Sequence, residues 1–260
     1  MALRRPAPPR LRRPAGAPPL APTPPAAPAP RRRTGRRAVL LVGAATAVAL
    51  PVVAGALRRG RESTPSAAHP FADVAPGAPG AEAMHWAHET GVQPAVSATA
   101  YAPDAVVTRA EVALALHRFA GAPAVPLATA PAPIADLCED PAQAAALVWL
   151  HGRGALWGDA ELRVHPEQPA TRDGAAMMLA ALLRPALTGV GVSWDAAAGT
   201  ALPQDPEPGS ALPDVAWLEA AGITPPIRSL ADWAGQDRVT RADLAVAVHR
   251  ADAVIADALA

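Results

Sequence analysis

The clearest hydrophobic pattern lies between Thr108 and Ala120. Val112, Leu116 and Phe119 follow one another at intervals of four and three residues, which places them on one face of a helix. Thr108 is suited to accept from the backbone N–H three residues later, and Glu111 is suited to reach back to the N–H of Thr108. Such a reciprocal capping box marks a helix start. The pattern therefore predicts a helix over Thr108–Ala120.

The same helix start returns twice, which indicates an internal repeat. Thr171-Arg172-Asp173-Gly174 and Thr240-Arg241-Ala242-Asp243 are altered copies of Thr108-Arg109-Ala110-Glu111. Upstream of each threonine is a glycine, at a distance of 17, 17 and 18 residues, and a tryptophan stands five residues before each glycine. These tryptophans are Trp86, Trp149 and Trp217, and the glycines are Gly91, Gly154 and Gly222. Chance does not keep these spacings in three places.

The remaining pattern predicts a further helix in each copy. In the first copy we expect a helix at Ala81–Thr90 that ends at Gly91, a residue type that tolerates the left-handed conformation after a helix. Strand patterns are scarce, so the predicted class is all-α, with helix pairs that pack by their apolar stripes. The predicted repeats cover residues 71–121, 134–184 and a shortened 212–258, in which the last helix continues to Ala258, and residues 185–211 are a predicted loop.

The N-terminal part differs from the repeats in composition. Residues 1–37 consist mainly of Pro, Ala and Arg, and we expect them to be disordered. The twenty residues Ala38–Leu57 carry no charge and are long enough to cross a bilayer, and residues 58–70 form a predicted linker. The positive-inside rule keeps the arginine-rich arm in the cytoplasm and exports the rest.

Two fates are open for the export segment. Arg36-Arg37 resembles a twin-arginine signal, and Ala54-Gly55-Ala56 is a cleavage site of the A-x-A type, which predicts a removed signal peptide. The arginines after that site favour the alternative, a retained transmembrane anchor over Ala38–Leu57. In both cases the repeats lie outside the cytoplasm.

The N-terminal part and the repeats also differ in charge. Residues 1–61 contain 13 Arg and no acid, whereas residues 62–260 contain 10 Arg and 23 acidic residues, a formal charge of −13. A basic arm before an export segment is explained by topology, so nucleic acid is not an expected partner. Cys138 is the only cysteine, which excludes an internal disulfide and a cysteine metal cluster.

The repeat closely resembles the S-layer homology (SLH) domain. The first copy carries the likeness from Phe71-x-Asp73-Val74 through Trp86 and Gly91 to Val107-Thr108-Arg109-Ala110-Glu111. The resemblance implies three helix–loop–helix repeats in a pseudo-threefold arrangement with a groove between adjacent repeats. It also implies non-covalent attachment to cell-wall polysaccharide, often a pyruvylated secondary polymer.

Carried over from the family, the groove residues are the arginines of the three helix starts and the acids that follow. The resemblance thus points to ligand-binding roles for Arg109, Arg172, Arg241, Glu111 and Asp243. Gly174 departs from the pattern, because the family has an acid there. A helix start also offers unpaired N–H groups to an anion, and an arginine beside it is able to hold a carboxylate. The alternative is that the arginines are solvated first-turn residues.

Other functions find little support in the sequence. The tryptophans before the glycines suit core packing better than sugar stacking, and His85 with His88 lacks a third metal ligand. We therefore expect no enzyme activity, no catalytic residues, no metal and no cofactor. The sequence predicts an exported cell-wall binding module. The alternative is a degenerate SLH fold that serves as an envelope structural or protein-interaction domain, and a hydrolase is the least favoured reading.

Overall fold

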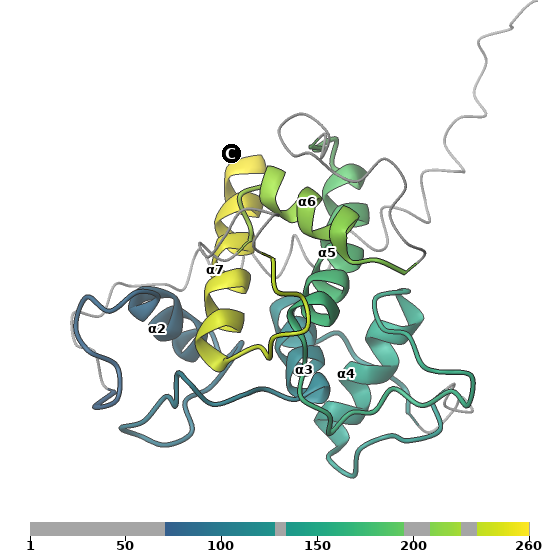
Figure 1. Cartoon of the computed structure of the whole chain (residues 1–260), viewed down its shortest axis with the longest axis horizontal. Helices are drawn as coiled ribbons and strands as arrows, with labels where there is room; N and C mark the ends of the chain where they lie inside the picture. The colour runs from purple at the N-terminus through teal and green to yellow at the C-terminus, as the bar shows by residue number, and fades with distance from the viewer. Residues whose placement is uncertain (1–70, 128–133, 195–208, 225–232, 260) are drawn as a thin grey trace, which may run out of the picture. The chain divides into compact units, whose positions relative to one another are not determined.

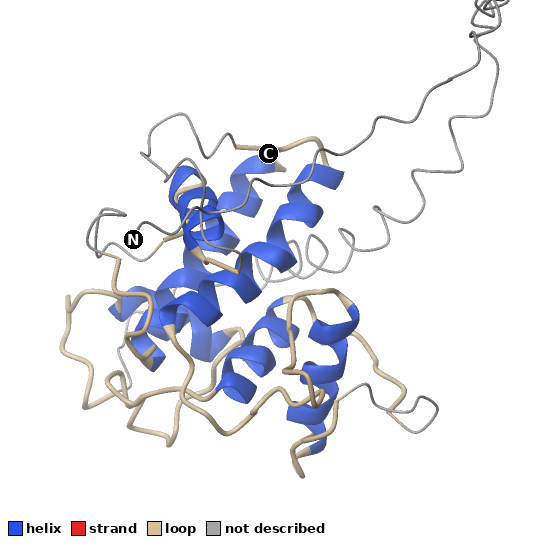
Figure 2. Ribbon diagram, turned by 45° about the vertical axis from the view of Figure 1, so that its right-hand side comes forward, coloured by secondary structure: helices blue, strands red, loops and turns tan. Residues whose placement is uncertain are grey.

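A computed structural model describes residues 71–127, 134–194, 209–224 and 233–259. These residues form six α-helices and no strand, which confirms the all-α class (Figure 2). None of the helices in these ranges is long and apolar enough to cross a membrane. The predicted arm, export segment and linker at residues 1–70 lie outside the described residues.

The two helices of the first repeat lie where the sequence places them. Helix α2 spans Ala81–Glu89, and Gly91 follows it with a φ of 70°. Helix α3 spans Arg109–Phe119. Thr108 accepts a hydrogen bond from the Glu111 N–H at 3.2 Å, and the Glu111 carboxylate accepts one from the Thr108 N–H at 2.7 Å. The predicted capping box is therefore confirmed.

Helices α4 and α5 follow. Helix α4 spans Pro141–Gly152, with proline in its first turn and the Asp140 carboxylate accepting from two backbone N–H groups. Helix α5 spans Arg172–Gly189. The predicted loop from residue 185 is wrong for residues 185–189, because the helix continues through Pro185. The buried Ala186 and Leu187 extend its apolar face beyond the proline, and their burial offsets the hydrogen bond that proline cannot donate.

The last two helices complete the described fold. Helix α6 spans Leu212–Ala220, and α7 spans Arg241–Ala258. The predicted extension to Ala258 is confirmed, and Leu244, Val248 and Ile255 are buried along α7. Thr240 and Asp243 form the second complete capping box.

The contacting helices belong to different predicted repeats rather than to the same one. Helix α3 packs against α4, α5 packs against α6, and α7 packs against α2, so that the first and last described helices meet (Figure 1). Each pair has one of the recurrent tryptophans at its interface. The Trp86 ring lies 5.1 Å from that of His249, the Trp149 ring lies 5.3 Å from that of His117, and the Arg184 guanidinium lies 5.1 Å from the Trp217 ring. These tryptophans pack helices together, as the sequence favoured.

Candidate functional site

A closed cycle of backbone hydrogen bonds joins the three threonine-capped helix starts. The backbone N–H of the residue before each capping threonine donates to the carbonyl of the residue before another capping threonine. The bonds run from Val107 to Val239 at 3.0 Å, from Ala170 to Val107 at 2.9 Å and from Val239 to Ala170 at 2.9 Å. These residues are buried. The cycle therefore fixes the starts of α3, α5 and α7 beside one another, and with them the three arginines.

The N–H groups of these helix starts are not free for a ligand. The backbone N–H of the arginine that begins each helix donates to a backbone carbonyl in the segment before another capping threonine. The backbone N–H of the next residue donates to a second carbonyl of the same segment. The third N–H donates to the capping threonine. The carbonyl acceptors are Gln168 and Pro166 for α3, Asp237 and Gly235 for α5, and Ala105 and Pro103 for α7. The expectation of unpaired N–H groups is wrong, because carbonyls of a neighbouring loop accept hydrogen bonds from the first backbone N–H groups of each helix.

Glu111 and Asp243 have capping roles. One oxygen of each accepts from the backbone N–H of the threonine that begins its helix, at 2.7 Å for Glu111 and 3.1 Å for Asp243. Each acid therefore stabilises its own helix start, and its predicted part in ligand binding remains a prediction.

Arg109 and Arg241 hold neighbouring loops in the same way. Arg109 donates from Nε to the Val164 carbonyl at 2.7 Å and from Nη2 to the Trp157 carbonyl at 3.4 Å. Arg241 donates from Nε to the Tyr101 carbonyl at 2.8 Å and from Nη2 to a carbonyl in the same loop at 2.6 Å. The acceptor positions correspond, since they lie seven and fourteen residues before a capping threonine.

Arg109 and Arg241 differ in what surrounds the guanidinium group. That of Arg241 lies over the Tyr101 ring, 4.9 Å from its centre. Burial lowers the pKa of Arg109, although the charge of nearby Asp136 acts against this. An arginine remains protonated despite such a shift, so both clamps keep their positive charge.

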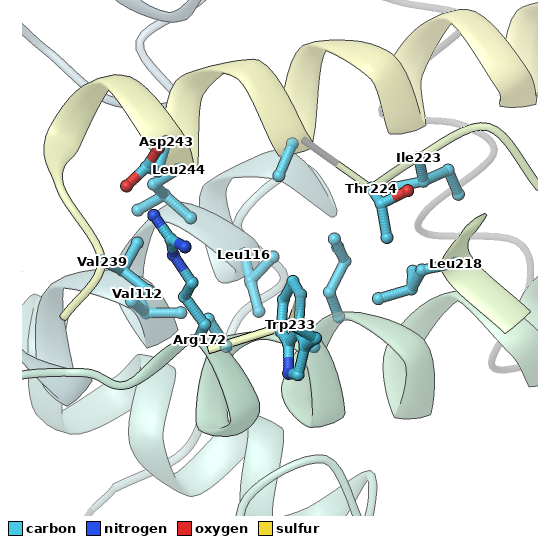
Figure 3. A pocket seen from close by; sticks show the side chains of 14 residues that line it. Val112, Leu116, Arg172, Leu218, Ile223, Thr224, Trp233, Val239, Asp243 and Leu244 are labelled. Atoms are coloured by element: carbon cyan, nitrogen blue, oxygen red, sulfur yellow. The ribbon is translucent and has the colours of Figure 1, made fainter. Parts of the chain in front are cut away.

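Arg172 lies in a more acidic setting. Its Nη1 is 3.7 Å from a carboxylate oxygen of Asp237, and its guanidinium extends toward Asp243 at one end of a small cavity (Figure 3). The cavity has a volume of about 50 Å³ and lies among α3, α5 and α7, lined mostly by apolar side chains. A small-molecule site usually needs several hundred Å³. The cavity is therefore too small for a sugar ring.

Asp173 has a role that the sequence did not reveal. Its carboxylate accepts from the Trp233 indole N–H at 2.8 Å and from the Gln236 side-chain amide at 3.1 Å. Gly235 packs so closely that a Cβ there would lie 2.1 Å from the Asp173 carboxylate. The signal was the change from Arg-Ala-Glu to Arg-Asp-Gly, which moves the acid by one position.

Two further aspartates shape the loops that the arginines clamp. Asp73 accepts from the N–H groups of Tyr101 and Ala102 at 2.9 and 2.7 Å. Asp136 accepts from those of Val164 and His165, both at 2.8 Å. Ala102 and His165 have positive φ values of 59° and 51°, an uncommon conformation that the two bonds help to hold.

Asp214 differs from these two aspartates, although its local sequence resembles theirs. It lies inside α6 and pairs with Arg184 at 2.9 Å, so it does not fix a loop. The shortening of the third repeat brings this aspartate to within three residues of Trp217, which places it on the helix.

An open hollow of about 460 Å³ lies between residues 136–139 and 165–168. Its lining includes the carboxylates of Asp136, Glu139 and Glu167. Carboxylates repel an acidic polymer, so the hollow does not suit the polysaccharide that the family resemblance implies. Within the described residues, no group of three His, Cys, Asp or Glu side chains is placed to hold a metal ion.

Comparison with known families identifies the first repeat. The model of the S-layer homology domain matches residues 70–113, the segment that contains α2, the Thr108 cap and Arg109. The match supports an S-layer homology domain in this part of the chain, and such domains are in general cell-envelope binding modules. The comparison with curated proteins finds no match.

Proposed function

We propose that this chain is an exported module that attaches non-covalently to cell-wall polysaccharide through the arginine-bearing helix starts. The proposal includes three S-layer homology repeats around a shared axis, with the second and third at residues 134–184 and 212–258. The match at residues 70–113 supports an envelope location, and cell-wall polymer is the class of partner that such domains generally bind.

The observation that carries the proposal is the threefold recurrence of one arrangement. The cyclic hydrogen bonds among Val107, Ala170 and Val239 bring the three helix starts together. An arginine stands first in each of the helices, and two of the arginines hold a neighbouring loop through matching carbonyls. An arginine held in a defined orientation is suited to bind a carboxylate, which is the acidic group of a pyruvylated or uronic acid polymer.

The charge of the exported part restricts how such a polymer is bound. A formal charge of −13 over residues 62–260 repels an acidic glycan at long range. Binding must therefore be local to the arginines or bridged by a cation. Affinity that depends weakly on ionic strength would indicate direct contact with a partly buried guanidinium.

A sedimentation assay tests the proposal. The full chain, purified in mild detergent, is mixed with native cell-wall sacculi and with sacculi stripped of secondary polymer. We expect the chain to sediment with native sacculi and to stay in solution with stripped ones. Glu82→Gln, on the solvent side of α2, is a matched surface control that we expect to bind like the unchanged chain. Equal sedimentation with both kinds of sacculi would contradict the proposal.

The alternative is an S-layer homology fold that has lost glycan binding and joins envelope proteins. Its support is the altered pattern in the second repeat and the shortened third repeat. A stable protein partner recovered by crosslinking from envelopes, together with no binding to native sacculi, would select this alternative.

A further inference from the structure

The small cavity among α3, α5 and α7 has a buried apolar floor and a partly exposed rim. Its floor includes the buried side chains of Leu116 on α3, Leu179 on α5 and Ile223 after α6. Its rim includes Ala175 of α5 and Ala247 of α7, which are both partly exposed. The cavity therefore opens between α5 and α7, where a group from outside the domain is able to enter.

The volume of the cavity limits the size of that group. A group the size of water needs about 10–15 Å³ of such space. The volume of about 50 Å³ thus holds about three or four non-hydrogen atoms. A sugar ring is too large, whereas a short substituent on a sugar ring fits. Because the walls are mostly apolar, a methyl group suits this space better than water does.

Trp233 forms a wall of the cavity in a fixed position. Its indole N–H donates to the Asp173 carboxylate at 2.8 Å, and the Gln236 side chain donates to the same carboxylate at 3.1 Å. The N–H is thus engaged by the protein, and the ring contributes apolar surface to the cavity. A flat group with a methyl end is well suited to pack against such a ring.

The polar end of the cavity favours a neutral hydrogen-bond acceptor. Arg172 extends toward Asp243 at this end, and its Nη1 lies 3.7 Å from Asp237, which is beyond hydrogen-bonding distance (Figure 3). Among the residues that the structure describes, the Arg172 guanidinium has no hydrogen-bond acceptor. The two carboxylates near it repel a further anion, whereas a carbonyl oxygen accepts from the guanidinium without that cost.

We propose that this cavity binds the acetyl group of an N-acetylated amino sugar. The methyl group lies among the apolar side chains, the carbonyl oxygen accepts from Arg172, and the sugar ring stays outside between α5 and α7. The bound group is a neutral acyl group, so the site differs in chemistry from an arginine that pairs with a carboxylate. This inference rests on the proposed function, because it names a class of sugar in the wall polymer that the module takes.

A series of sugars titrated against the ¹⁵N-labelled full chain in mild detergent tests the cavity. The NMR signal of the Trp233 indole N–H reports binding, and Trp233→Phe identifies this signal among those of the six tryptophans. We expect N-acetylglucosamine to shift the signal and to saturate it at concentrations on the order of millimolar. Glucose lacks the acetyl group, and the longer acyl chain of N-butanoylglucosamine exceeds the cavity, so we expect both to bind at least about tenfold more weakly. Equal affinity for all of these sugars would overturn the inference.

Two matched substitutions on α7 locate the bound group. Leucine at Ala247 adds an isopropyl group at the rim, which about fills the cavity, whereas Ala253 is exposed and does not line it. We expect Ala247→Leu to remove the shift caused by N-acetylglucosamine and Ala253→Leu to retain it. An unchanged affinity in Ala247→Leu would exclude the cavity as the site. Thermal unfolding shows whether Ala247→Leu is folded, and if it is not, the sugar series on the unchanged chain decides.

Sedimentation with native sacculi separates this inference from the proposed function. A chain that sediments with sacculi, but whose Trp233 signal does not respond to N-acetylglucosamine at high concentration, overturns the inference and leaves the proposed function in place. A chain that binds N-acetylglucosamine in the cavity, but stays in solution with native sacculi, contradicts the proposed function while the acetyl site stands.

Discussion

The acidic residue in the first turn stands at the third position of α3 but at the second position of α5. In α3 the acid is the third residue, Glu111, and it closes a capping box with Thr108. In α5 the acid is the second residue, Asp173, and it binds Trp233 and Gln236 of the third repeat. Thr171 still accepts from the Gly174 N–H, at the same 3.2 Å that separates the corresponding atoms in α3.

The difference shows how one shifted residue exchanges a local contact for a long-range one. Glu111 stabilises the helix to which it belongs, whereas Asp173 ties α5 to a segment sixty residues away in the sequence. The loop that carries Trp233 and Gln236 lies between Gly222 and Thr240 and is one residue longer than the corresponding loops of the first two predicted repeats. The bonds to Asp173 hold this loop against α5, and the third position of α5 is left to Gly174, which has no side chain beside Arg109.

The largest expected effect comes from removing the long-range tie. Asp173→Ala leaves the Trp233 indole N–H without its acceptor and also removes the bond to Gln236. Hydrogen bonds to a charged group contribute about 1.5–3 kcal/mol each, and partial exposure reduces this, so we expect a loss of about 2 kcal/mol. Chemical denaturation measures the change in the free energy of unfolding.

The corresponding substitution in α7 serves as the control for Asp173→Ala. Ala242 holds the second position of α7 and, like Asp173, is partly exposed, so Ala242→Ser tests whether any change at that position destabilises the domain. A loss below about 0.5 kcal/mol in Asp173→Ala would mean that the loop at residues 233–236 is held by other contacts.

Substitution of the capping threonines compares a complete capping box at Thr108 with a single capping hydrogen bond at Thr171. Thr108→Ala removes a cap whose partner Glu111 also binds back, and we expect a loss of about 1.5 kcal/mol. Thr171→Ala removes only the bond from the Gly174 N–H, and we expect about 1 kcal/mol. Urea unfolding of both variants gives the comparison. Equal losses would show that the reciprocal bond of Glu111 adds nothing measurable.

The sequence predicted what local patterns determine. The capping boxes at Thr108 and Thr240 and the end of α2 before Gly91 follow from the residues within each helix, and the structure has them where the sequence placed them. Pro185 misled the prediction, because its local preference against a helix is overridden by burial of the apolar residues after it.

The candidate site was only partly predictable. The three arginines were identified from their recurrence, but their contacts depend on loops that lie far away in the sequence, such as the bond from Arg241 to Tyr101. The same long-range packing brings loop carbonyls to the first backbone N–H groups of α3, α5 and α7, and no local sequence pattern reveals these hydrogen bonds. The bonds from Trp233 and Gln236 to Asp173 are equally long-range and stayed hidden for this reason.

A smaller, stabilising effect is expected from a substitution at Gly174 in α5. Gly174→Ala lowers the entropy lost on helix formation, a gain that reaches about 1 kcal/mol in a helix interior. The new Cβ would lie 3.3 Å from Thr171 Oγ1, which requires a slight shift, so we expect a gain of about 0.5 kcal/mol. Thermal unfolding measures it. A destabilised Gly174→Ala would show that the space beside Arg109 is too tight even for a methyl group.

The weakest effect is a pH dependence that differs in sign between two matched aspartates. Backbone hydrogen bonds from Tyr101 and Ala102 lower the pKa of Asp73, so its contribution to stability is present above its unfolded pKa and is lost as the pH falls through the folded value. Burial raises the pKa of Asp214 and outweighs the ion pair with Arg184, so its contribution is present at low pH and is lost as the pH rises.

Unfolding between pH 3 and 6 tests this difference. We expect Asp73→Asn to reduce the loss of stability on acidification, because the variant no longer takes up that proton on unfolding. Asp214→Asn is expected to make the acid loss steeper, since it removes the group that acts in the opposite direction. Parallel pH profiles for both variants would show that the two aspartates titrate alike. The loop-fixing role of Asp73 and the helix-bound role of Asp214 would then not differ in their electrostatics.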